Sequence, residues 1–243
     1  MCRKWLGYST KPLNECVPMP QLVNNIAGMP NLDFVIRKAN LQDLPRLAEL
    51  HCSSFGRQEH VPIMLGQRYV MATYRWLVTS DMTYVLVAEA EGAIKGLVAV
   101  ADRPFTNPMF KACAGEFILS IFIHPGLLFK RKLWKRLFRR PALTAQGQRI
   151  ANYPGMAQMT IGAVDSACRG KGMFCELVKA TCVFSKERAS RAVRAGVYKT
   201  NWPSRRVFIK CGWLEAPALE TSETVDYIYF MDPSFRNELG LSD

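Results

Sequence analysis

A buried strand that runs through a basic, glycine-containing turn into a helix constrains this sequence more than any other stretch. The apolar run at 159–164 is typical of a buried strand, and Arg169-Gly170-Lys171-Gly172 follows a few residues later. Beyond the turn, apolar side chains recur at helical spacing on one face: Met173, Leu177, Val178 and Cys182. The sequence therefore predicts a strand, a turn and a helix in immediate succession, with the helix ending near Arg188.

This arrangement is suited to binding an anion. The first-turn N–H groups of a helix have no partner within the helix, and the helix dipole places partial positive charge there. Gly170 and Gly172 lack the Cβ atoms that would obstruct a phosphate, and Arg169 and Lys171 add full charges. An ordinary turn before a core helix gives the same local pattern, so this stretch alone leaves both interpretations open.

The remaining pattern predicts one large domain that mixes strands and helices. With 243 residues, of which 49% are hydrophobic and 21% charged, the chain has the composition of a folded protein with a sizeable core. Residues 1–32 contain four prolines and no clear period, so we expect an N-terminal extension before a single domain at 33–243. Further expected elements are a strand at 34–37, a helix capped by Asn40, a helix at 61–78, a hairpin of 84–90 and 93–100 around Glu91-Gly92, a strand at 192–198, a helix at 205–211, and strands near 213–219 and 225–230.

A basic segment interrupts this order. The chain carries a net charge of +12, and residues 130–140 alone hold seven Lys or Arg and no acidic residue. The connection at 103–155 is too long for a simple link between strands, and 127–140 reads as a basic amphipathic helix after a turn at His124. Three interpretations remain: the helix packs on the domain, it contacts an anionic membrane or an acidic partner, or, least favoured, it binds nucleic acid.

The cysteines and the N-terminal residues indicate the cellular compartment in which the protein is expected. The eight cysteines form no C-x-x-C pair and have no nearby histidine cluster, so we expect reduced thiols, no disulfide framework and no metal site. Residues 1–30 are interrupted by Pro, Asn and Gly and contain no signal-peptide core, and no apolar stretch reaches ~20 residues. The sequence predicts a cytoplasmic protein, peripheral to a membrane if 127–140 docks there, as a monomer or a homodimer.

Two motifs at a fixed separation carry a family resemblance. The first reads Val164-x-x-x-x-Arg169-Gly170-Lys171-Gly172-x-Phe174. The second begins 32 residues after Arg169 and reads Asn201-x-x-Ser204-x-x-x-Phe208-x-Lys210-x-Gly212-Trp213. With the order of elements, the two motifs resemble those of the GNAT superfamily of acyl-CoA-dependent N-acetyltransferases. The resemblance covers about 33–231, with 103–155 as an insertion before the fourth strand.

The resemblance implies a fold and an activity. The fold would be α+β, with a central, mostly antiparallel sheet flanked by helices. The activity would be transfer of an acetyl group from the co-substrate acetyl-CoA to an amine, by direct attack in a ternary complex. The acceptor would be a small molecule or a peptide amine. The alternatives are a non-catalytic acyl-CoA sensor or docking module, and a basic membrane- or nucleic-acid-binding protein with an accidental motif match.

The resemblance also assigns cofactor-binding positions. Backbone N–H groups of the turn and first helical residues would hold the pyrophosphate of acetyl-CoA: Arg169, Gly170, Lys171, Gly172, Met173 and Phe174. The strand residues Gly162, Ala163 and Val164 would pair with the pantetheine amides. Asn201 would hydrogen-bond the pantetheine arm. Phe174 departs from the small residue that the family usually has at that position.

The resemblance is less complete for the catalytic residues. The family's usual acid is a tyrosine where this chain has Phe208, and its usual base is a glutamate on the fourth strand, where 157–162 contain no carboxylate. Substitute proton donors near the thiol would be Ser204, Tyr198 or Cys211. A remote base would be Glu116 or Asp102. Each of these residues also has a purely structural interpretation, and positioning of a free amine alone provides part of the acceleration.

Overall fold

A seven-stranded sheet forms the centre of the described chain. The computed structural model describes residues 34–56, 60–137 and 143–241. The predicted N-terminal extension at 1–32 therefore lies outside the described residues. The strand order is β1-β2-β3-β4-β5-β7-β6, and every neighbouring pair is antiparallel except β4 and β5, which confirms the predicted α+β class. The strands are β1 (Phe34–Lys38), β2 (Thr83–Ala90), β3 (Ala93–Ala101), β4 (Met156–Val164), β5 (Ala192–Tyr198), β6 (Leu214–Glu215) and β7 (Thr224–Phe230).

Helices connect and cover these strands. The α-helices are α2 (Leu44–Ser54), α3 (Val61–Met64), α4 (Gln67–Thr79), α5 (Thr106–Ala112), α6 (Ala114–Ile123), α7 (Arg131–Leu137), α8 (Ala145–Ala151), α9 (Met173–Glu187), α10 (Trp202–Lys210) and α11 (Ser234–Glu238). The 3-10 turns are η1 (Leu41–Asp43), η2 (Pro125–Phe129), η3 (Ser166–Cys168) and η4 (Pro217–Leu219). Across the described ranges, no helix combines the length and the apolar character that crossing a membrane requires.

The predicted hairpin is present and has the expected turn. Glu91 and Gly92 join β2 to β3 with φ angles of +53° and +71°. Positive φ at both central residues is the geometry whose twist matches that of the flanking strands, and glycine adopts it without steric cost. Local turn chemistry therefore fixed the pairing of the two strands.

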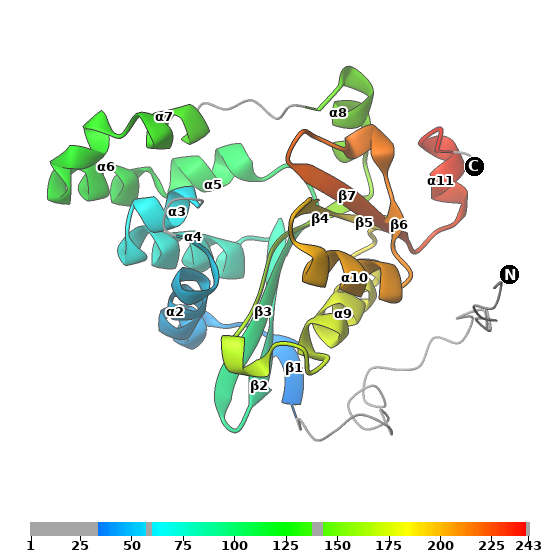
Figure 1. Ribbon diagram of the computed structural model, residues 1–243, viewed down its shortest axis with the longest axis horizontal. Helices are drawn as coiled ribbons and strands as arrows, with labels where there is room; N and C mark the ends of the chain where they lie inside the picture. Colours follow the sequence, from blue (N-terminus) through cyan, green and yellow to red (C-terminus); the bar gives the residue numbers. More distant parts are fainter. Residues whose placement is uncertain (1–33, 57–59, 138–142, 242–243) are drawn as a thin grey trace, which may run out of the picture. The chain divides into compact units, whose positions relative to one another are not determined.

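Helices α2 and α4 pack on one face of the sheet and α9 packs on the other. Leu47, Val70 and Leu97 are fully buried in the first of these layers. Met173, Leu177 and Val193 are fully buried in the second. Figure 1 shows the β2–β3 hairpin between the two layers.

Local signals set the ends of several helices. Asn40 caps η1 as predicted: its side chain accepts from the Gln42 N–H, and Asp43 accepts from the Asn40 N–H. The single helix predicted at 61–78 is wrong, because Gly66 adopts a φ of +100° and divides it into α3 and α4.

Two predicted elements in the last third of the chain differ from the structure. The helix predicted at 205–211 begins earlier, at Trp202, because Pro203 fits a first helical turn and Asn201 caps it. The strand predicted at 213–219 is reduced to β6, because η4 starts at Pro217. Both differences trace to a proline whose position favours a helical start.

Residues between β3 and β4 form a helical layer beside α3 and α4. Helices α5 and α6 contact α4, and α7 contacts α3, whereas α8 contacts η4 near β7 (Figure 1). The single amphipathic helix predicted at 127–140 is wrong: η2 ends at Phe129 and α7 begins at Arg131. Residues 138–140 lie outside the described ranges.

The break between η2 and α7 changes which apolar residues are buried. Leu127 and Leu133 are buried against Leu65 and Tyr69, so this part of the segment packs on the domain. Phe129, which a continuous helix at 127–140 would place on the same face as Leu133, is instead exposed. The 3-10 turn rotates Phe129 away from the helical layer.

Helices α2 and α4 are joined by a buried histidine. The His51 Nδ1 atom lies 2.9 Å from the Tyr74 hydroxyl oxygen, and both side chains are inaccessible to solvent. Burial, with a smaller contribution from His60, lowers the pKa of His51 from 6.5 to about 3. His51 is therefore neutral in the folded protein throughout the physiological range.

We expect His51 to make the fold sensitive to mild acid. The pKa of His51 is higher in the unfolded state than in the folded state. Its contribution to the free energy of unfolding is therefore fully present above about pH 6.5 and is lost as the pH falls toward the folded-state pKa. The free energy of unfolding should fall by about 2 kcal/mol between about pH 7 and about pH 5. Urea unfolding at the two pH values measures this loss.

The matched control is His51→Gln, which keeps a hydrogen-bonding group beside Tyr74 and does not titrate in this range. The stability of the variant should change with pH by about 2 kcal/mol less than that of the wild type. Equal pH dependence of the two proteins would contradict the assignment.

Candidate functional site

The site begins where β4 and β5 separate. The two strands pair in parallel only from Met156 to Met159, opposite Ala192 to Ala195. Beyond that point β4 continues along β3 and β5 continues along β7. In the described structure no strand pairs with the β5-facing edge of 160–164, so the backbone groups on this edge are available to an extended ligand, apart from the Val164 carbonyl, which accepts from Arg169.

A bulge in β4 marks the point of separation. Val100 pairs with Met159 and Ala99 pairs with Ile161, which leaves Thr160 as an extra residue. The Thr160 hydroxyl donates to the Ala99 carbonyl oxygen at 3.1 Å. Because a bulge bends its strand and increases local twist, it directs the second half of β4 away from β5.

The turn after β4 is anchored on two sides. The Asp165 N–H donates to the Lys95 carbonyl at 2.7 Å, and the Asp165 side chain accepts from the Ala167 N–H. Arg46 of α2 donates to the Asp165 carboxylate at 2.9 Å. These contacts, the Ala167 N–H first, lower the pKa of Asp165, so its carboxylate is ionised and holds the turn against α2.

The N-terminus of α9 is open to solvent beside this turn. Gly170 and Gly172 have φ angles of +75° and +86°, which glycine adopts without strain. Gly172 is the N-cap residue of α9 and has no side chain that could bond the first-turn N–H groups, so these groups remain available. Arg169 and Lys171 are exposed on the same turn, with the Arg169 Nε donating to the Val164 carbonyl at 3.1 Å.

The Phe174 ring explains why β4 has a glycine at position 162. A Cβ built on Gly162 would lie 2.8 Å from the Phe174 Cε2 atom and 2.9 Å from the Met159 Cε atom. The Phe174 ring also lies edge-on to Phe208 of α10, with centroids 5.9 Å apart. The large residue at 174 therefore covers the α9-facing side of β4 where the two strands have separated, and glycine at 162 accommodates it.

Three of the predicted residues meet where β5 passes into α10. The Asn201 N–H donates to the Tyr198 carbonyl at 2.8 Å, and the Asn201 side chain accepts from the Ser204 N–H at 3.3 Å. Tyr198 is exposed and Ser204 is half-buried. The fold thus brings Tyr198, Asn201 and Ser204 together at the open end of β5, with the Asn201 oxygen serving as a helix cap.

Phe208 belongs to the core. Its side chain is 2% exposed, stacks on Tyr227 at 5.5 Å and packs edge-on to Trp213. Cys211, predicted as a substitute donor, instead pairs with Cys175 of α9, with their Sγ atoms 2.9 Å apart. The hydrogen bond from Cys211 lowers the pKa of Cys175 to about 7.

The two predicted remote bases lie away from the opening. Asp102 follows the end of β3 and accepts from the Arg188 Nε at 2.7 Å, just beyond α9. Glu116 lies on α6, where its carboxylate is 3.8 Å from Arg68. Neither carboxylate belongs to the open end of β4 and β5.

The structure reveals a buried polar cluster that the sequence analysis missed. It lies on the face of β4, β5 and β7 opposite α9, at the closed end of the opening. The Arg194 Nη2 donates to the Gln158 Oε1 at 2.8 Å, and the Arg194 Nη1 lies 3.4 Å from the Asp226 Oδ1. Side-chain exposures are 12% for Arg194 and 6% for Asp226. The Arg194 Nε is buried without a hydrogen-bond partner among the described residues.

Burial perturbs both charged groups of this cluster. Burial raises the pKa of Asp226, and the nearby Arg194 charge opposes that effect only in part. Burial likewise lowers the pKa of Arg194. A carboxylate with a raised pKa beside an opening in a sheet is a candidate proton acceptor.

Gly196 gives access to that carboxylate. It pairs with Asp226 across β5 and β7, and a Cβ on Gly196 would lie 3.4 Å from both carboxylate oxygens. Gly196 is exposed, so a ligand above it reaches an otherwise covered Asp226. The available sequence signal was an aspartate inside the apolar strand Val225-Asp226-Tyr227-Ile228, opposite a glycine in another strand.

Together these features favour one kind of ligand. An extended molecule with amide groups fits the free β4 edge, its anionic end fits the α9 N-terminus, and its other end meets Asp226 and Gly196. Within the described ranges, no three His, Cys, Asp or Glu side chains gather as metal ligands.

The Arg194–Asp226 pair should behave as a unit in stability measurements. Arg194→Met leaves a carboxylate buried without its cation, so we expect a loss of about 3 kcal/mol in the free energy of unfolding at neutral pH. Adding Asp226→Asn removes that charge and should restore part of the loss. Urea unfolding of the two single variants and the double variant measures the coupling between the two residues. If the loss in the double variant equals the sum of the two single losses to within about 0.5 kcal/mol, the residues are not coupled.

The comparisons with known proteins agree with this architecture. No family model and no curated protein matches the sequence. The GNAT domain of S. lividans PAT is similar in structure, with a TM-score of 0.51, 16% sequence identity, and coverage of 81% of this chain and 89% of that chain. The PaiA N-acetyltransferase from Thermoplasma acidophilum, solved in complex with coenzyme A, has a TM-score of 0.52 at 10% identity, covering 81% and 98%. The chain therefore has the fold of the GNAT acetyltransferases, as its two motifs predicted.

Proposed function

We propose that this protein is an N-acetyltransferase that transfers an acetyl group from acetyl-CoA to an amine in a ternary complex. The separation of β4 and β5 in front of the uncapped α9 N-terminus is the observation that carries the proposal. This arrangement places an anion site and a buried carboxylate beside the same unpaired stretch of β4.

Acetyl-CoA fits this arrangement in one orientation. Its pyrophosphate would lie against the backbone N–H groups from Arg169 to Phe174, beside the Arg169 and Lys171 charges. Its two pantetheine amides would pair with the free edge of β4 at Gly162, Ala163 and Val164. Its thioester would then lie in the gap between β4 and β5, beyond the last pair of the parallel ladder, Met159 and Ala195.

The reaction requires a neutral amine, a route for its proton and a leaving thiolate. The amine nitrogen attacks the thioester carbonyl carbon, the new C–N bond forms, and the C–S bond breaks to release the CoA thiolate. The nitrogen transfers its proton to the Asp226 carboxylate through the space above Gly196. Holding the amine next to the thioester contributes much of the acceleration, since it replaces a bimolecular encounter.

Two hydroxyl groups on the β5 side of the opening are our candidate proton donors. Tyr198 ends β5 and Ser204 lies in the first turn of α10, and either hydroxyl would donate a hydrogen bond to a departing sulfur held in the gap. Phe208 supplies no proton. The acceptor is a small-molecule or peptide amine that approaches on the face of the sheet that carries Arg194 and Asp226.

Acetyl-CoA should stabilise the protein. At about 100 times its dissociation constant, a ligand specific for the folded state adds about 2.7 kcal/mol, which appears as an upward shift in thermal denaturation. Gly172→Asp places a carboxylate against the pyrophosphate and should abolish the shift. Gly126→Asp, at an exposed glycine with open space around it, should leave the shift unchanged.

Thermal denaturation without and with acetyl-CoA, followed by thiol release on a panel of amines, separates the hypotheses. The absence of a shift would refute every acyl-CoA function. A shift without thiol release would identify a non-catalytic acyl-CoA sensor, the alternative that Phe208 favours.

Asp226→Asn should lower kcat by about 100- to 10,000-fold, because the amide cannot accept the proton. In the wild type, kcat should rise with pH as Asp226 loses its proton. The midpoint of this rise should lie above the ordinary aspartate pKa of 3.8, because burial raises the pKa of Asp226. The rise should be absent in Asp226→Asn. Rate measurements across pH with saturating acetyl-CoA test both statements.

Gly196→Val provides a second, independent variant. It keeps the Arg194–Asp226 pair and covers the carboxylate from the acceptor side, so we expect loss of activity with acetyl-CoA binding retained. Full activity in Gly196→Val and an unchanged pH profile in Asp226→Asn would eliminate Asp226 as the base.

A further inference from the structure

An apolar patch is exposed on the helical layer between β3 and β4. It consists of Ile118, Phe122, Ile123, Leu128 and Phe129, all on α6 or η2, two neighbouring elements. Phe122 is 78% exposed and Phe129 is 83% exposed. Single exposed apolar residues are common, but five of them within twelve residues of chain mark an interaction surface.

The packing of α6 on the domain leaves one of its apolar faces exposed. Phe117 and Ile121 point into the helical layer, where Phe117 lies 6.3 Å from the Tyr69 ring. Ile118 and Phe122 each follow one residue later, about 100° around the helix, and both are exposed. Helix α6 therefore packs Phe117 and Ile121 against the domain and leaves a neighbouring apolar face uncovered.

Cations border the patch. Lys130, Arg131, Lys132 and Lys135 follow directly in sequence and are all exposed. Residues 117–137 contain no acidic residue, and the acid that precedes them, Glu116, lies near Arg68. Apolar side chains bordered by an uninterrupted set of cations are complementary to a surface that is apolar inside and anionic outside.

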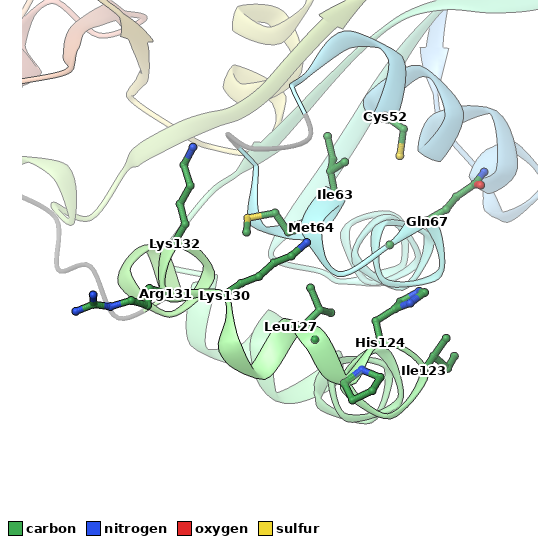
Figure 2. Close-up of a pocket in the computed structure, with 13 residues that line it drawn as sticks. Cys52, Ile63, Met64, Gln67, Ile123, His124, Leu127, Lys130, Arg131 and Lys132 are labelled. Atoms are coloured by element: carbon green, nitrogen blue, oxygen red, sulfur yellow. The ribbon is translucent and has the colours of Figure 1, made fainter.

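A groove of about 1070 Å³ adjoins the same cations. Ile63 and Met64 of α3 line one side, and Leu127 and Lys130 line the other. Figure 2 shows Lys130 extending across the groove toward Met64, whereas Arg131 points away from it. The groove thus combines a positive charge with apolar side chains, which is complementary to a phospholipid, with its anionic headgroup and apolar acyl chains.

We infer that this face of α6, η2 and α7 docks on an anionic lipid bilayer. Phe122 and Phe129 would enter the boundary between headgroups and acyl chains, and Lys130, Arg131 and Lys135 would contact anionic headgroups. Leu127 and Leu133 anchor the surface to the domain from beneath, because both are buried against α3 and α4. The inference is independent of the acetyl-transfer proposal.

Flotation with phosphatidylcholine vesicles, with and without phosphatidylserine, tests the inference. The wild type should bind the anionic vesicles and bind less as salt rises. Phe122→Ser/Phe129→Ser should reduce the partition coefficient at least about tenfold. Lys130→Gln/Arg131→Gln/Lys135→Gln should reduce it on the order of 100-fold on anionic vesicles, at about fivefold for each cation.

Two matched controls remove the same groups elsewhere. Leu41→Ser/Leu214→Ser changes two half-exposed leucines outside the patch, and Arg149→Gln/Arg206→Gln/Lys210→Gln removes three exposed cations. Each control should lose much less binding than its counterpart.

Equal binding of the double serine variant and the wild type would overturn the inference, as would equal binding to neutral and anionic vesicles. Size-exclusion chromatography with light scattering tests whether a second copy of this chain covers the patch instead. A dimer that the double serine variant abolishes, without vesicle binding, would assign the patch to a second copy of the chain and overturn the inference.

Discussion

The loss of pairing between β4 and β5 beyond Met159 is the constraint on which the site depends. A parallel ladder between them would have covered the β4 edge and left no room for an extended ligand. The bulge at Thr160 produces the separation, and the Arg46–Asp165 contact together with the packing of α9 maintains it. Backbone groups left unpaired in a sheet are costly unless water or a ligand satisfies them. The fold therefore keeps this edge accessible.

The buried polar cluster is the second unusual feature of the sheet. Arg194 and Asp226 lie on strands whose other faces are apolar, and their contact at 3.4 Å leaves the Arg194 Nε without a described partner. An incompletely satisfied pair is a poor device for stability, because desolvation of both charges offsets their attraction. Its place at the closed end of the opening, below Gly196, is better explained by chemistry than by folding.

Sequence alone predicted the parts that local chemistry determines. Glu91-Gly92, Asn40 and Gly172 each require a particular backbone conformation, and the structure has it. The sequence failed where tertiary register decides. Arg194 and Asp226 are far apart in the chain, and only the pairing of β5 with β7 brings them together. Phe129 was misplaced for a related reason: a 3-10 turn rotates it relative to Leu133, and periodicity read across 127–140 assumes one continuous helix.

The short parallel seam between β4 and β5 also has a mechanical consequence. Four residue pairs join the half of the sheet formed by β1–β4 to the half formed by β5, β7 and β6, with α9 packed across both. The sheet therefore consists of two well-paired halves joined by a short seam. A molecule that pairs with β4 in the gap would extend β4's hydrogen bonding beyond that seam and so contribute to the connection between the two halves.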